Sequence, residues 1–74
     1  MNVEYHIDYF DRGSALVYSE SARTHEAGAK AFETAIDRAK RWDLIQVVEF
    51  SRQGTKRSQM LGRWEKGKWS NATF

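Results

Sequence analysis

The apolar residues of this chain change their spacing along the sequence, and that change restricts which elements the chain can form. In residues 3–10, VEYHIDYF, every second side chain from Val3 to Tyr9 is apolar, which is typical of a strand with one buried face. The residues expected on the buried face are Val3, Tyr5, Ile7 and Tyr9. The turn-forming sequence DRGS follows, and residues 15–20 predict a second strand. Because this connection is too short for a parallel crossover, we expect an antiparallel hairpin.

The spacing becomes helical after Thr24. Apolar side chains then recur every three or four positions, which predicts an amphipathic helix over residues 25–42. The Thr24 hydroxyl is a suitable N-cap because it can accept a hydrogen bond from a free amide of the first turn. The expected apolar face consists of Ala27, Ala31, Phe32, Ala35, Ile36, Ala39 and Trp42. The many alanines on this face would let the helix lie close to a sheet.

Three further strands are predicted after the helix. Residues 44–50, LIQVVEF, are dense in β-branched and apolar side chains, and their alternation predicts that Ile45 and Val47 share a face. Residues 57–65, RSQMLGRWE, predict the next strand, and residues 68–74, KWSNATF, predict the last. The expected order is therefore ββαβββ.

This order predicts an α+β fold class in which one helix packs on one face of a single antiparallel β-sheet. Seventy-four residues are enough for one domain with a small core, so we expect a single domain over residues 1–74. The chain has no cysteine, which excludes disulfides and thiolate metal sites. The N-terminus lacks the pattern of a secretory signal, and no apolar run approaches the roughly 20 residues that span a bilayer. We therefore expect a cytoplasmic protein without a membrane partner.

The charges are distributed unevenly. Residues 1–37 hold three Lys/Arg and seven Asp/Glu, a net charge of −4, whereas residues 38–74 hold nine Lys/Arg and three Asp/Glu, a net charge of +6. Such an asymmetry points to an anionic partner for the basic half. The alternative is that the two halves fold together and their charges mix on one surface.

The basic residues and tryptophans near the C-terminus form the candidate partner-binding set. Six Lys/Arg lie within residues 52–68, and Glu65 is the only acid among them. Basic turns of this kind can bind phosphates or an acidic protein surface, and Phe50 or the tryptophans could stack on unpaired bases. Alternatively, these cations are solvated residues that discourage aggregation between sheet edges. The candidate residues are Arg52, Lys56, Arg57, Arg63, Trp64, Lys66, Lys68 and Trp69.

The segment WEKGKW, residues 64–69, predicts a tight hairpin with Lys66 and Gly67 in its turn. This geometry would place Glu65 opposite Lys68 and Trp64 opposite Trp69. The paired indoles either lock the hairpin and cover the core or form a contact surface. On a regular strand Met60 and Trp64 would point to the same side. We expect Arg63 and Lys66 to be replaceable without loss of stability.

The sequence contains no pattern that indicates catalysis or a cofactor. His6 and His25 lie at generic positions, whereas a metal site usually needs three or four converging ligands. A Gly-x-Ser-x-Gly nucleophile motif and a phosphate-binding glycine loop are both missing. We therefore expect a protein that is not an enzyme and uses neither a metal nor another cofactor.

Three segments resemble small phage-encoded anti-CRISPR inhibitors of a type I-F kind: AKAFETAIDRAKRW, IQVVEF and RWEKGKW. The resemblance covers about half of the chain and implies one helix on an antiparallel sheet. Members of that family bind protein subunits of a CRISPR surveillance complex where guide RNA and target DNA pair. The resemblance implies a contact role for basic and aromatic residues, which here are Arg63, Trp64, Lys66, Lys68 and Trp69.

We first expect a non-catalytic binding module, a phage or mobile-element inhibitor, that binds a host protein or nucleoprotein complex. The second hypothesis is a domain that binds nucleic acid directly. The third is a small structural protein that pairs sheet edges into a homodimer.

Overall fold

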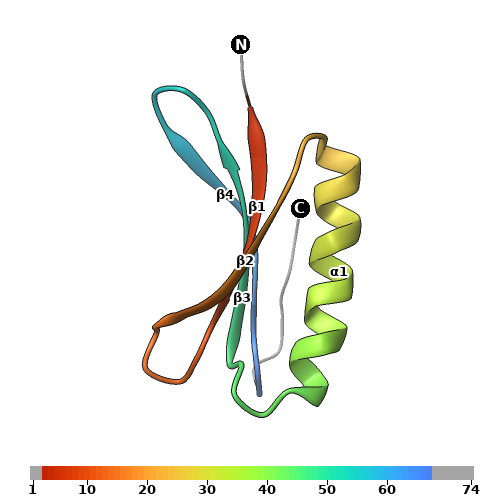
Figure 1. Cartoon of the computed structure of the whole chain (residues 1–74), viewed down its shortest axis with the longest axis vertical. Coiled ribbons are helices and arrows are strands. Elements are labelled where there is room, and N and C mark those ends of the chain that lie inside the picture. Colours follow the sequence, from red (N-terminus) through yellow and green to blue (C-terminus); the bar gives the residue numbers. More distant parts are fainter. Residues whose placement is uncertain (1–2, 68–74) are drawn as a thin grey trace.

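The computed structural model describes residues 3–67, which form one helix and a four-stranded antiparallel sheet in the order ββαββ (Figure 1). The predicted α+β class, with one helix on an antiparallel sheet, is confirmed. The fifth strand expected over residues 68–74 lies outside the described residues. The elements are β1 (Glu4–Phe10), β2 (Leu16–Ala22), α1 (His25–Arg41), β3 (Val47–Gln53) and β4 (Ser58–Glu65).

The strand order in the sheet is β2-β1-β3-β4. The predicted β1–β2 hairpin is confirmed, although β2 runs to Ala22 instead of ending at Glu20. Its turn is held by Asp11, whose Oδ1 accepts hydrogen bonds of 2.9 Å from the amides of both Gly13 and Ala15. β3 then returns beside β1, so β2 and β4 form the two edges of the sheet.

The helix lies along one face of the sheet and contacts β1, β2 and β3. It begins as the sequence predicts, because the Thr24 Oγ1 accepts a 3.1 Å hydrogen bond from the amide of Ala27. Its last residue is Arg41, and Trp42 forms the C-cap. Basic residues in the last turn and Glu26 in the first turn suit the helix dipole.

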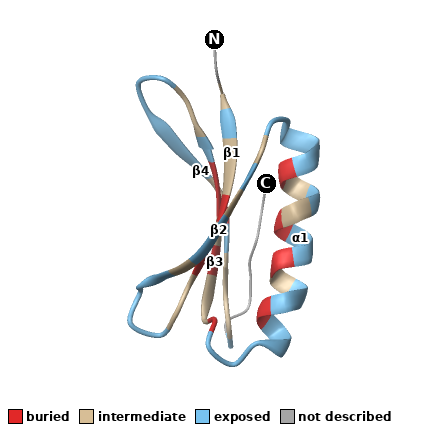
Figure 2. Cartoon of the chain, viewed as in Figure 1, coloured by how far each residue is buried: buried red, intermediate tan, exposed pale blue. Residues whose placement is uncertain are grey.

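The core fills the space between α1 and the sheet, and the buried residues of the helix face the strands (Figure 2). The expected helical face is largely confirmed, but Ala27 and the C-cap Trp42 are exposed, and Gly28 is buried next to Ala27. The side chains of the core have no exposed surface: Ile7, Tyr9, Phe32, Ala35, Ala39, Ile45, Val48 and Phe50.

The third strand begins later than predicted, at Val47. Ile45 precedes it and is fully buried, while Val47 is only half-buried, so the prediction that they share a face was wrong. The physical reason is the turn that follows the helix. The Ile45 amide donates to the Trp42 carbonyl at 3.0 Å, which places Ile45 outside the alternation of the strand.

Candidate functional site

Three exposed cations lie at the β3–β4 turn: Arg52 near the end of β3, and Lys56 and Arg57 in the connection to β4. We call this set the cationic turn. The four-residue connection between the strands is closed by a 2.9 Å hydrogen bond from the Gly54 amide to the Arg57 carbonyl. A Cβ on Gly54 would lie 3.3 Å from that carbonyl oxygen, so glycine suits this tight closure.

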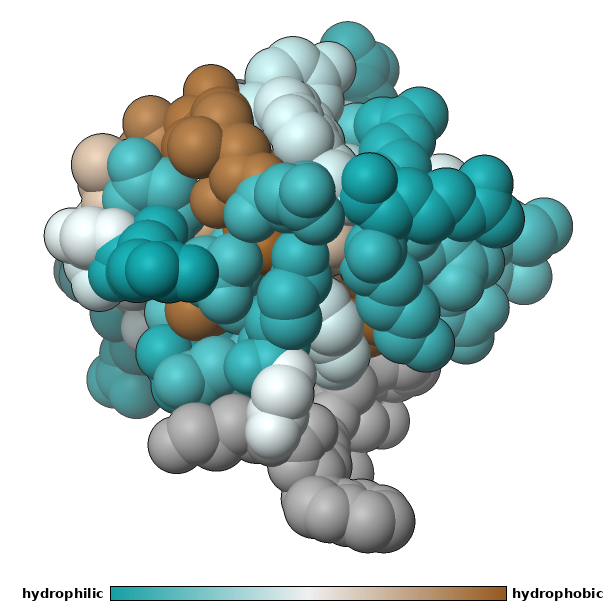
Figure 3. Space-filling model, turned by 90° about the horizontal axis from the view of Figure 1, so that it is seen from below, coloured by the Kyte–Doolittle hydropathy of each residue, from teal (hydrophilic) through white to brown (hydrophobic). Residues whose placement is uncertain are grey.

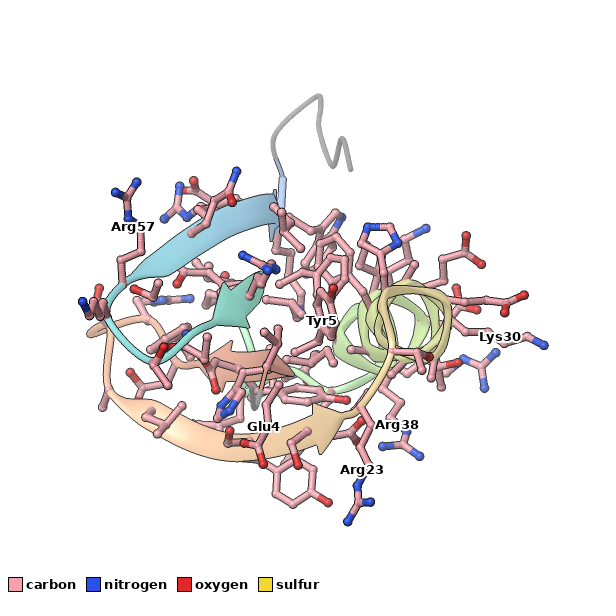
Figure 4. All side chains as sticks on the ribbon, turned by 90° about the horizontal axis from the view of Figure 1, so that it is seen from above. Glu4, Tyr5, Arg23, Lys30, Arg38 and Arg57 are labelled. Carbon is pink, nitrogen blue, oxygen red and sulfur yellow. The ribbon has the colours of Figure 1, made fainter. Side chains whose placement is uncertain are left out.

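The cationic turn surrounds a depression of about 350 Å³. Its rim is polar and positively charged, and Figure 4 shows Arg57 directed away from the sheet and the helix. No carboxylate within residues 3–67 forms an ion pair with any of the three cations. Three positive charges thus converge here without internal neutralisation. The depression is lined by Val3, Arg52, Gly54, Thr55, Lys56, Arg57 and Gln59.

Arg63, in contrast, is neutralised by the chain itself. Its Nε lies 3.3 Å from Glu49 Oε2 and its Nη1 lies 2.9 Å from Glu65 Oε1. It belongs to the face of the sheet opposite α1, where one polar row crosses all four strands through the register partners Ser19, Asp8, Glu49 and Arg63. Arg63 therefore balances carboxylates on this open face and is poorly placed as an electrostatic anchor.

Lys66 is also tied to the fold. Its amide donates to the Gln46 carbonyl at 2.8 Å, and its Nζ donates to the Trp42 carbonyl at 3.2 Å. These contacts join the end of β4 to the loop after the helix. Arg63 and Lys66 thus both have partners in the folded chain, and the expectation that they are replaceable without loss of stability stays a prediction.

The aromatic residues considered for the predicted site differ in how far they are buried. Phe50 is fully buried and cannot stack on a base. Trp64 is half-buried and packs against the core, as a structural role requires. Gly67 has the positive φ of 82° that the predicted turn needs. Lys68 and Trp69, and with them the Trp64–Trp69 pair, lie outside the described residues.

A bulge in the β3–β4 ladder changes the sides on which the β4 residues point. Phe50 pairs with Gly62 and Ser51 pairs with Met60, which leaves Leu61 as the extra residue. Met60 therefore faces away from the helix, while Trp64 lies opposite the buried Val48. The prediction that Met60 and Trp64 share a side was wrong for this reason.

A second depression, of about 520 Å³, lies at the C-terminal end of α1 and was not predicted from the sequence. Trp42 there is 41% exposed, and its ring lies 6.2 Å from the buried ring of Tyr9. Burial raises the pKa of the Tyr9 phenol, and the neighbouring Arg38 guanidinium opposes that shift. The sequence pattern that could have indicated this depression is the helical spacing of its lining residues: Thr34, Asp37, Arg38, Arg41 and Trp42.

This second depression combines both signs of charge. Arg38 Nη1 lies 3.2 Å from Glu20 Oε2 of β2, and Asp37 shares the rim with Arg41. It therefore lacks the unbalanced charge of the cationic turn.

Within residues 3–67, no three His, Asp or Glu side chains are grouped so that they could hold a metal ion. The one helix in this range is too short and too polar to cross a membrane. No protein-family model, curated protein or solved structure matches this chain.

Proposed function

We propose that this protein is a non-catalytic binding module whose cationic turn docks on an anionic surface of a larger partner. The observation that carries the proposal is the absence of any ion pair between Arg52, Lys56 or Arg57 and a carboxylate of residues 3–67. Arg12 and Lys30 form no such ion pair either, but the three cations of the cationic turn line one depression together, whereas Arg63 pairs with Glu49 and Glu65. Exposed, unbalanced cations attract anionic partners over a Debye length and orient the encounter.

The partner that best suits this surface is a host protein or nucleoprotein complex. An inhibitor of such a complex, encoded by a phage or mobile element, is the role implied by the resemblance to anti-CRISPR proteins. Direct binding of nucleic acid is the competing function, because the same three cations could contact phosphates. It is less favoured, since Phe50 is buried and Trp64 is partly covered, so that neither of these two rings of β3 and β4 is freely available for stacking on bases bound at the cationic turn.

The test compares two double variants that change the net charge equally. Lys56→Glu/Arg57→Glu reverses the cationic turn, and Arg12→Glu/Lys30→Glu reverses two exposed cations elsewhere. Immobilised native chain and both variants are used to capture proteins from a bacterial lysate. We expect a stoichiometric partner with the native chain and the control, and a loss of affinity of more than about tenfold, or about 1.4 kcal/mol, with the cationic-turn variant.

A fluorescent single-stranded oligonucleotide separates the competing function. Direct binding would give an affinity that falls steeply between about 50 and 200 mM salt. Equal capture by both variants would contradict the proposed role of the cationic turn. Tight, salt-sensitive oligonucleotide binding that depends on Lys56 and Arg57 would instead establish the nucleic-acid function.

A further inference from the structure

The outer edge of β2 is open for strand pairing. β2 is the terminal strand of the order β2-β1-β3-β4, so along this edge the backbone amides and carbonyls have no ladder partner within residues 3–67. Figure 4, which looks along the sheet from above, shows no element beyond β2 on that side. The helix packs on one face of the sheet, mainly against β1 and β3.

The sequence of β2 lacks the devices that usually protect an edge. LVYSESA contains no proline, lysine or arginine. Its one charged residue, Glu20, is directed to α1, where it meets Arg38 at 3.2 Å. A bulge at Val17 interrupts the pairing with β1, but it lies near one end of the strand. The rest of the edge is regular and uncharged.

Two large apolar side chains are exposed on this same strand. Leu16 is 58% exposed and Tyr18 is 50% exposed. Both lie in the half of β2 that follows the β1–β2 turn. Seen from below, the largely hydrophilic surface of the molecule is interrupted by a hydrophobic patch (Figure 3). An open edge with exposed apolar side chains is a template for another strand.

We infer that β2 pairs with β2 of a second copy of this chain, antiparallel about a two-fold axis at Ser19, to form a continuous eight-stranded sheet. This inference is independent of the proposed function. Ser19 is the central residue of the seven-residue strand Leu16–Ala22, so an axis there pairs the whole strand with itself. Each copy then contributes the same surface, as a two-fold interface requires.

The charges along the strand favour this register. With the axis at Ser19, Glu20 of one copy lies opposite Tyr18 of the other, and Leu16 lies opposite Ala22. An axis at Glu20 would instead place two carboxylates directly opposite each other, which is unfavourable in a sheet. An axis at Ser21 would pair only the last residues of the strand.

Single cysteines test this geometry, because the native chain has no cysteine. Ser19→Cys places two thiols at the axis, with a Cα separation of about 4.5–5.5 Å that suits a disulfide. Ser21→Cys is the matched control. Both serines are exposed and point to the same face of the sheet, but two cysteines at position 21 would be four residues apart along the ladder, about 13 Å.

In a glutathione redox buffer we expect Ser19→Cys to form a disulfide-linked dimer several-fold faster than Ser21→Cys. Sedimentation equilibrium of the native chain should show a monomer–dimer equilibrium, and Lys56→Glu/Arg57→Glu should dimerise equally well. Thermal melting of both cysteine variants confirms that they fold. A native chain that stays monomeric at every concentration would overturn the inference. Equal cross-linking at positions 19 and 21, or dimers without cross-linking at 19, would also overturn it.

Discussion

Gly28 lies where α1 comes closest to the sheet. A Cβ at this position would be 2.8 Å from Phe50 Cε1, which is shorter than real Cβ contacts, and 3.0 Å from Tyr5 Cβ, which is a tight contact. Phe50 is fully buried and cannot move aside freely. A glycine within a helix costs helical propensity, so the presence of Gly28 in the first turn of α1 is explained by the tight packing it permits.

Gly28→Ala should therefore destabilise the protein. The overpacking cost of about 1–3 kcal/mol exceeds the gain in helix propensity of about 1 kcal/mol. Urea unfolding measures the difference. Gly13→Ala is the control, because its Cβ would meet only Asp11 Oδ1, at 3.6 Å, in an exposed turn; we expect a change within about 0.5 kcal/mol there. A Gly28→Ala variant as stable as the native chain would contradict this account of the helix–sheet contact.

Tyr9 places a phenol in the core. The side chain has no exposed surface, and its buried hydroxyl makes no well-formed hydrogen bond. Burial raises the pKa of this phenol above the ordinary 10.0. The unfolded chain therefore releases the proton at a lower pH than the folded chain does, and the native protein loses stability as the pH rises through and above that ordinary value.

Tyr9→Phe should remove this loss of stability at alkaline pH. We expect the unfolding free energy of the variant to be within about 1 kcal/mol of native at neutral pH, and the difference to shift in favour of the variant as the pH increases. Urea unfolding across the alkaline range measures it. Tyr18→Phe is the comparison, because the ring of Tyr18 is 50% exposed. Parallel pH profiles for native chain and Tyr9→Phe would disprove the linkage.

At the scale of elements, α1 depends on its cap as well as on its buried face. The Thr24 hydroxyl satisfies a first-turn amide that has no partner in the helix. Thr34 is also an exposed threonine of this region, but its Oγ1 donates to the Lys30 carbonyl one turn earlier, which satisfies no free amide. The two threonines therefore allow a matched comparison of capping against propensity.

Thr24→Ala should cost about 1 kcal/mol of stability. Thr34→Ala should be neutral or slightly stabilising, since alanine has the higher helix propensity. Circular dichroism at increasing urea concentrations gives both values. If the two substitutions had equal effects, the helix would not depend on the Thr24 cap.

At the scale of the whole molecule, folding separates the cations that are close in sequence. The cationic turn lies at one end of the structure, while the basic last turn of α1 lies at the other, along a longest dimension of 37 Å. This length exceeds the Debye length of about 8 Å at physiological salt, so the two regions act independently. The excess of positive charge in residues 38–74 is thus divided in the fold between the cationic turn and the last turn of α1.

The order of the elements was predictable because it depends on local periodicity. The alternation in residues 3–10 and the helical spacing after Thr24 determine strand and helix, and both were confirmed. The start of β3 was not predictable, since the buried side chain of Ile45 and the half-buried Val47 are both apolar in the sequence. Within residues 3–67, the site was predicted only partly: Arg52, Lys56 and Arg57 remain as candidates, whereas Arg63 and Lys66 have partners in the fold.

The sequence by itself determined the elements, the helix cap and the buried parity of the first strand, because these follow from neighbours three or four positions apart at most. Only the tertiary structure decided which cations are balanced, that Leu61 forms a bulge and that β2 is left at an open edge. Glu49 and Arg63 are fourteen positions apart, and they meet only because β3 and β4 pair in one particular register. Ion pairing and edge exposure are thus properties of the assembled sheet, which the spacing of residues along the chain does not specify.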